Sequence, residues 1–175
     1  MRKVYVETYG CWLAKADAEI LRQRLGLELA SNVEESDVVL IYTCAVREDG
    51  EVRQLARIRD LARSGREMIV AGCLARLRPY TIKSLAPGAT LIYPQQVEGG
   101  PEREMKILPE FSGGVVYTVP LQVGCLGNCT FCATKYTRGG AGYVKSADPE
   151  EVVRKARKAV AMGAREIYLT GQDVI

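Results

Sequence analysis

One uninterrupted apolar run decides the fold of this chain: Val38-Val39-Leu40-Ile41-Tyr42-Thr43, followed directly by Cys44. Such a run, without alternating polar residues, is typical of a strand buried on both faces of a parallel sheet. Outward from it, short apolar segments alternate with segments of helical periodicity. We expect further strands at 4–9, 68–71 and 90–93, and helices at 17–25, 51–63 and 79–85. This alternation predicts an α/β fold with a parallel sheet and right-handed crossovers.

Three cysteines follow three of these predicted strands. Cys11 comes after the first strand, Cys44 after the central one and Cys73 after the third. Because the carboxyl ends of parallel strands share one edge, and ligands bind in the crevice there, we expect these thiols to point toward one place. The alternative is that they are small apolar residues capping strands, which is a common use of cysteine. The repeated placement favours a metal cluster at this edge.

The other three cysteines lie close together in the sequence. The stretch Gly124-Cys125-Leu126-Gly127-Asn128-Cys129-Thr130-Phe131-Cys132 has the spacing Cys-x3-Cys-x2-Cys. Short spacings of this kind let one loop wrap one iron–sulfur cluster. Three thiolates leave one iron of a four-iron cluster open to an outside molecule. A zinc site or three buried cysteines remain alternatives, although structural zinc sites prefer four ligands, often with histidine, and the chain has no histidine.

The composition indicates the class of protein and the cellular compartment in which this chemistry would occur. The chain has 175 residues, of which 47% are apolar, and a net charge of +3. No stretch approaches the roughly 20 apolar residues that span a bilayer, and the first residues do not resemble a signal peptide. Six cysteines in such a chain indicate metal or redox chemistry in the cytoplasm rather than disulfides. The charge is too small to identify a nucleic-acid partner.

The sequence pattern changes near residue 100, where prolines, paired glycines and mixed charges predict a linker. We therefore divide the chain into an amino-terminal domain at 1–100, a linker at 101–114 and the start of a second domain at 115–175.

The second domain begins with a predicted strand at 115–123, which leads into the cysteine loop. Pro120 inside it is typical of an edge strand. Asp148 and Pro149 are suited to open a helix, and a further strand is expected at 166–170. We assign five residues to the inner face of that helix: Val152, Val153, Ala156, Ala159 and Val160.

The segments around all six cysteines resemble one known family. The string Leu121–Cys132 looks like the signature of radical S-adenosylmethionine (SAM) enzymes, and more narrowly of the methylthiotransferases among them. The segments Thr8–Cys11, Thr43–Glu48 and Ala71–Ala75 resemble the three cysteine segments of the methylthiotransferase amino-terminal domain. The resemblance implies that this parallel-sheet domain is followed by the first βα units of a radical SAM partial barrel. It covers nearly the whole chain but only the front part of a typical family member.

The same resemblance implies the cofactors. Two [4Fe-4S] clusters are expected, an auxiliary cluster on the three strand-end cysteines and a second on the cysteine loop, where SAM binds the open iron and is cleaved to a 5′-deoxyadenosyl radical. The implied cluster ligands are Cys11, Cys44, Cys73, Cys125, Cys129 and Cys132. Arg138 is a candidate contact for SAM or nucleic acid, and Gln172 lies near where the family holds the SAM amino group. Ala14 and Tyr42 stand where the family usually has asparagine, which alters polar contacts around the auxiliary cluster.

The implied activity is that of a tRNA methylthiotransferase, which inserts a methylthio group at C2 of N6-threonylcarbamoyladenosine beside the anticodon. The sequence looks most like the archaeal and eukaryotic branch, with tRNA, SAM and an electron donor as partners and no membrane. Alternatives are the isopentenyladenosine-tRNA branch, the ribosomal-protein aspartate branch, a non-catalytic two-cluster electron carrier and a structural zinc protein. We expect the 175-residue chain alone to be inactive, because only two barrel strands are present.

Overall fold

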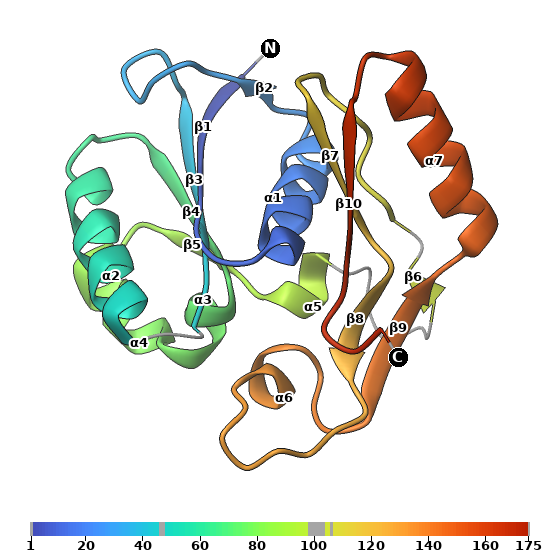
Figure 1. Ribbon diagram of the computed structural model, residues 1–175. Coiled ribbons are helices and arrows are strands. Elements are labelled where there is room, and N and C mark those ends of the chain that lie inside the picture. The colour runs from blue at the N-terminus through green and yellow to red at the C-terminus, as the bar shows by residue number, and fades with distance from the viewer. Residues whose placement is uncertain (1, 46–47, 98–103, 106, 175) are drawn as a thin grey trace.

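A computed structural model describes residues 2–45, 48–97, 104–105 and 107–174 (Figure 1). In chain order the elements are β1 (Lys3–Thr8), α1 (Trp12–Arg24), β2 (Glu28–Leu29), β3 (Val38–Thr43), α2 (Glu48–Ala62), β4 (Glu67–Gly72), α3 (Cys73–Leu77), α4 (Pro79–Leu85), β5 (Thr90–Ile92), α5 (Pro94–Val97), β6 (Glu104–Met105), β7 (Val116–Pro120), β8 (Gln122–Cys125), α6 (Thr134–Thr137), β9 (Tyr143–Ala147), α7 (Pro149–Ala161) and β10 (Glu166–Thr170).

The amino-terminal half is built on a five-stranded sheet with the strand order β2-β1-β3-β4-β5. All four pairings are parallel, which confirms the predicted parallel-sheet α/β fold. Strand β3 is the middle strand, and each of its six residues is buried. Helices α1 and α5 cover one face of the sheet, while α2 and α4 cover the other (Figure 1). The apolar run therefore forms the centre of the core because it is covered on both sides.

Helix α1 begins at Trp12, earlier than the predicted start at residue 17. Cys11 has the extended backbone conformation of an N-cap residue, so the helix starts directly after the first cysteine. Leu13 in its first turn is buried in a cluster formed mainly by residues from the second half of the chain. That distant packing extends the helix beyond its local sequence pattern.

The predicted strand at 115–123 is two strands in two different sheets. Strand β7 pairs in parallel with β10, whereas β8 pairs antiparallel with β9, which the sequence pattern did not predict. Leu121 lies between them: its N–H donates to Thr170 O at 2.8 Å, and its carbonyl accepts from Ala147 N at 2.8 Å. The chain thus changes partner at Leu121, directly after Pro120.

Helix α7 has a narrower buried face than predicted. Val152 and Ala159 are buried as expected, but Val153 and Val160 are 48% and 56% exposed, so their assignment to the inner face was wrong. Lys155 is buried in their place, where its Nζ donates to the carbonyl of Leu108.

The two halves share one hydrophobic cluster. It joins Leu13 of α1 to the buried faces of β7 and α7 and to Leu108 and Phe111. In Figure 1, α1 lies between the five-stranded sheet and the β7–β10 pair, and α7 covers the far side of that pair. Within the predicted linker, residues 101–103 and 106 lie outside the described residues, whereas Leu108 and Phe111 are part of the core. None of the helices in the described ranges has both the length and the apolar character needed to cross a membrane.

Candidate functional site

The first three cysteines lie at the carboxyl ends of β1, β3 and β4, which are neighbouring strands. A Cβ atom placed on Gly10 would lie 2.7 Å from the sulfur of Cys44, so the backbone beside Cys11 touches Cys44. Cys44 and Cys73 are near enough to interact electrostatically. Cys11 is exposed, while Cys44 and Cys73 are partly buried, and all three are free thiols. Val46 and Arg47, from the segment after Cys44, lie outside the described residues.

The backbone of Cys44 is held by Gln54, a buried amide on α2. Cys44 N donates to Gln54 Oε1 at 2.8 Å, and Gln54 Nε2 donates back to the Cys44 carbonyl at 3.0 Å. Sequence reasoning missed this residue. Its signal was a polar side chain at helical spacing from the buried Ile58 and Leu61, a position that otherwise belongs to the core.

The second set of cysteines begins with Cys125, the last residue of β8, and continues in the loop after it. The sulfurs of Cys125 and Cys129 both lie beside Gly127, at 3.3 and 3.9 Å from the position of a Cβ atom on that glycine. The Gly127 N–H donates to the Cys125 sulfur at 3.2 Å. Cys132 lies further along the loop, where Thr134 and Lys135 surround its thiol. Cys129 is exposed and the other two are partly buried.

Residues after β10 hold this loop in place. Gln172 Oε1 accepts from Gly124 N at 2.7 Å, and Asp173 Oδ2 lies 3.4 Å from the Cys125 sulfur. Gln122 is buried, and its Oε1 accepts from the backbone N–H groups of both Gln172 and Asp173. Gln172, expected near SAM, is therefore placed beside the cysteine loop. The sequence analysis did not identify Gln122 or Asp173.

The two sets are joined by the segment that follows the cysteine loop. Helix α6 packs against α3, and the Thr137 side chain forms a hydrogen bond with Cys73. Arg138, expected to contact SAM or nucleic acid, is 2% exposed and pairs with Asp17 of α1. Sequence reasoning missed Asp17, whose signal was a charged residue between two core alanines, Ala16 and Ala18.

The surroundings shift the pKa values of two of the thiols in opposite directions. Burial raises the pKa of Cys73, an effect that the nearby Arg138 charge and the hydrogen bond from Thr137 oppose. Hydrogen bonds from the hydroxyl and backbone N–H of Thr134 lower the pKa of Cys132. A lower pKa favours the thiolate, which is the form that binds metal.

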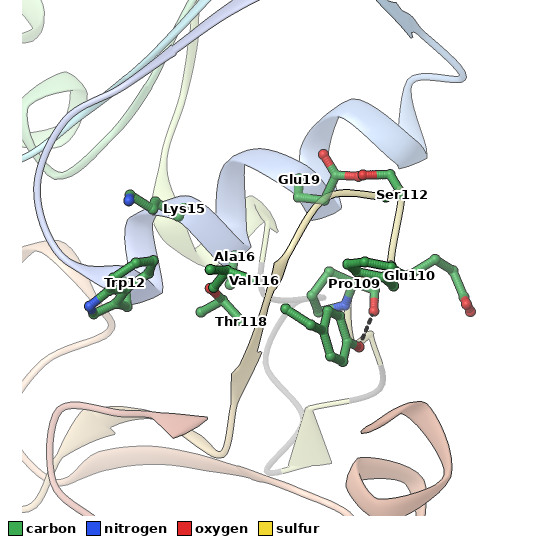
Figure 2. A pocket seen from close by; sticks show the side chains of 12 residues that line it. Trp12, Lys15, Ala16, Glu19, Pro109, Glu110, Ser112, Val116 and Thr118 are labelled. Atoms are coloured by element: carbon green, nitrogen blue, oxygen red, sulfur yellow. Dashed lines mark hydrogen bonds between the residues drawn. The ribbon is translucent and has the colours of Figure 1, made fainter. Parts of the chain in front are cut away.

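A cavity of about 320 Å³ lies between α1, β7 and residues 109–113. Figure 2 shows Trp12, Lys15 and Glu19 along α1 at this cavity, with Val116 and Thr118 on the strand across from them. Trp12 stacks on Tyr168 of β10, with ring centroids 4.0 Å apart. Lys15 Nζ lies 3.9 Å from the centre of the Trp12 ring. The lining is mixed in charge and polarity, so it does not indicate one class of ligand.

The metal-binding donors of both sets are cysteine thiols. Within the described ranges, no group of three or more histidine, cysteine or acidic side chains is arranged around one metal-ion position. A four-iron cluster is wider than an ion, so its thiolates stand further apart, and sulfur ligands suit iron–sulfur chemistry. Cys44 lies against Gly10, the residue before Cys11, and the sulfurs of Cys125 and Cys129 both lie beside Gly127. The cysteines present are thus compatible with one cluster for each set.

Comparison with known proteins places this arrangement in a class. The model of the Radical SAM superfamily matches residues 119–175, which contain the end of β7, strand β8, the cysteine loop and β10. Members of that superfamily use an iron–sulfur cluster and SAM. The model of Uncharacterized protein family UPF0004 matches residues 3–93, the whole five-stranded sheet. The chain belongs to the family UPF0004.

Curated relatives match both halves together. A protein of Methanocaldococcus jannaschii named probable threonylcarbamoyladenosine tRNA methylthiotransferase is 34% identical over 98% of this chain and 44% of its own length. The protein of the same name from Pyrococcus abyssi is 33% identical over 99% of this chain and 45% of its own length. A tRNA-2-methylthio-N(6)-dimethylallyladenosine synthase of Rickettsia felis is 32% identical, with coverages of 99% and 46%. The chain spans less than half the length of these relatives.

Proposed function

We propose that the protein containing this chain is a radical SAM transferase that adds a methylthio group to an adenosine of tRNA. The observation that supports this most strongly is the presence of two separate cysteine sets in one packed unit, one on the sheet edge and one on the loop after β8. A radical SAM enzyme that only cleaves SAM needs one such set. A second set provides a place for sulfur chemistry near the first.

The residues would divide the work as follows. Cys125, Cys129 and Cys132 would hold the cluster that binds SAM and supplies one-electron reduction. Gln172 would orient the loop through Gly124, which its side chain already contacts. Asp173 accepts from the Leu126 N–H at 3.4 Å and so fixes the turn after Cys125.

The sheet-edge cysteines would hold the auxiliary cluster. Gln54 fixes the backbone of Cys44 on both its N–H and its carbonyl. Partial burial of Cys44 and Cys73 shields that site from water, whereas the exposed Cys11 leaves one side accessible. We assign the sulfur-donating part of the reaction to this accessible side.

The substrate we propose is N6-threonylcarbamoyladenosine, with the methylthio group added at C2. Support comes from the printed names of the archaeal relatives, five of which carry that substrate at 29–35% identity. The isopentenyladenosine-type substrate of the Rickettsia relatives is the second candidate, at 31–32% identity. An electron donor and a cytoplasmic location complete the proposal.

Two variants of the full-length protein test the division of labour. Cys129→Ala is expected to abolish formation of 5′-deoxyadenosine from SAM, while Cys44→Ala retains it but no longer yields methylthiolated tRNA. Iron and sulfide analysis after anaerobic reconstitution should show about half the parent iron in each variant, because one cluster of two is lost. Normal methylthiolation by Cys44→Ala would refute the auxiliary role. Cluster reduction without SAM consumption by the parent would instead identify an electron carrier.

A further inference from the structure

A buried ionic cluster joins the two cysteine-bearing halves of the chain. Arg138 Nη2 donates to Asp17 Oδ2 at 2.6 Å, and the Tyr42 hydroxyl donates to the same oxygen at 2.8 Å. The three side chains come from α1, β3 and the end of α6, and each is at most 2% exposed. Two of them belong to the amino-terminal half and one to the radical SAM half.

Stability alone is a poor explanation for such a pair. Removing two charges from water is costly, and apolar replacements of buried ion pairs are often neutral or stabilising. A buried pair does, however, penalise every arrangement in which one partner is left alone. It therefore selects one relative placement of the elements that carry it.

Each member of this cluster lies in or next to an element that adjoins a cysteine site. Asp17 lies in the helix that begins after Cys11, and Tyr42 shortly precedes Cys44 in β3. Arg138 is the residue directly after α6, the helix that follows Cys132, and its neighbour Thr137 forms a hydrogen bond with Cys73. Displacing the Arg138 segment would therefore move the cysteine loop relative to the sheet edge.

We propose that Arg138, Asp17 and Tyr42 form a positioning lock, which fixes the loop of Cys125, Cys129 and Cys132 relative to the sheet edge of Cys11, Cys44 and Cys73. The lock deepens the proposed function, since two sites that act on one adenosine need a fixed separation. It also gives Tyr42, which departs from the asparagine usual in the resembling family, a role of its own.

The lock is tested by a distance measurement that requires no iron, SAM or tRNA. Cys11 and Cys129 are the two exposed cysteines, one in each set. A chain that keeps these two and has serine at the other four positions is spin-labelled, and the label separation is measured by dipolar electron paramagnetic resonance. The parent should give one narrow distribution. Asp17→Asn and Arg138→Gln should each widen it about twofold, because the cysteine loop then samples several placements relative to the sheet edge.

Matched variants separate positioning from general destabilisation. Glu67→Gln removes the long-range but exposed ion pair with Arg2 and should leave the distribution narrow. Arg138→Lys keeps the cation and should give a narrower distribution than Arg138→Gln. The double variant Asp17→Asn/Arg138→Gln should widen it no further than Arg138→Gln alone, since that change already removes the contact with Asp17.

The outcomes that overturn the lock are equally specific. Distributions for Asp17→Asn and Arg138→Gln as narrow as that for Glu67→Gln would exclude it, and so would additive widening in the double variant. If circular dichroism shows that Asp17→Asn does not fold, the comparison of Arg138→Lys with Arg138→Gln decides. If the distance measurements support the lock but the full-length protein does not cleave SAM, only the proposed function is refuted. If the full-length protein cleaves SAM but the distance measurements exclude the lock, only the lock is refuted.

Discussion

At the scale of single residues, the amide side chains of two glutamines hold the two cysteine sets in place. Gln54 forms hydrogen bonds with the Cys44 backbone. The side-chain oxygen of Gln122 accepts hydrogen bonds from the backbone N–H groups of Gln172 and Asp173, which hold the cysteine loop. Each of these amides is buried. Buried amides are favourable only when they are hydrogen-bonded, so they hold their partners in defined positions.

Gly124 is a residue whose replacement should disrupt the loop directly. Its φ is +86°, and a Cβ atom there would lie 1.9 Å from the carbonyl oxygen of Tyr143 on β9. Gly124→Ala is expected to cost about 3 kcal/mol or more, because backbone would have to move. Gly142→Ala is the matched control, since Gly142 also has positive φ (+76°) but no atom within 4 Å of a Cβ; its cost should be about 1–2 kcal/mol. Urea unfolding measures both, and equal costs would contradict the steric argument.

Glu7 should make stability depend on pH. Burial acts to raise the pKa of this carboxylate, but hydrogen bonds and charge from Arg57 lower it overall. A carboxylate whose folded pKa is lowered stabilises the fold above its unfolded pKa of about 4.3, and this stabilisation is lost as pH falls through the folded value. Glu7→Gln should therefore cost about 1 kcal/mol at pH 7, after allowance for the partly exposed Arg57.

The difference between parent and Glu7→Gln should shrink below about pH 4. Urea unfolding at several pH values measures it, with Glu67→Gln as the exposed-pair control. A difference that stays constant down to the lowest pH at which both chains fold would rule out the linkage.

At the scale of elements, local signals determined which segments were predicted well. Strand β3 and helix α4 have the predicted bounds, because their signals are local: a continuous apolar run for β3 and a first-turn proline for α4. The change from β7 to β8 was missed, since residues 115–123 form one apolar pattern and only remote partners divide it. The same reason explains why the pairing of Asp17 with Arg138 was missed, since the two residues are 121 positions apart in the sequence. The placement of the three strand-end cysteines followed from topology alone.

Helix α7 offers a direct test of its buried face. Val152 and Val153 are adjacent valines, of which the first is buried in the shared cluster and the second is about half exposed. Val152→Ser should cost about 2 kcal/mol, whereas Val153→Ser should change stability by no more than about 0.5 kcal/mol. Thermal or urea unfolding gives both values. A larger loss for Val153→Ser would restore the broader inner face expected from sequence.

At the scale of the whole molecule, one hydrophobic core packs together the two halves that carry the cysteine sets. Leu13 from α1, Phe111 from the predicted linker and Val119 from β7 pack in one cluster. Gln23 of α1 exchanges two hydrogen bonds with the backbone of Glu110, whose carboxylate also pairs with Lys155 and Lys158. The segment between the halves is thus structural in its described part, and it helps to keep the two sites in one frame.

The stacking of Trp12 on Tyr168 gives the molecule an internal optical reporter. Trp12 is the sole tryptophan of the chain, and its ring meets a strand from the opposite half. Its fluorescence therefore senses the junction, while far-ultraviolet circular dichroism senses all the helices and strands. With a shared core, the two signals should lose amplitude at the same urea concentration. Tyr168→Leu should shift the Trp12 emission before any denaturant is added. An emission spectrum unchanged by Tyr168→Leu would mean that the rings do not stack in solution.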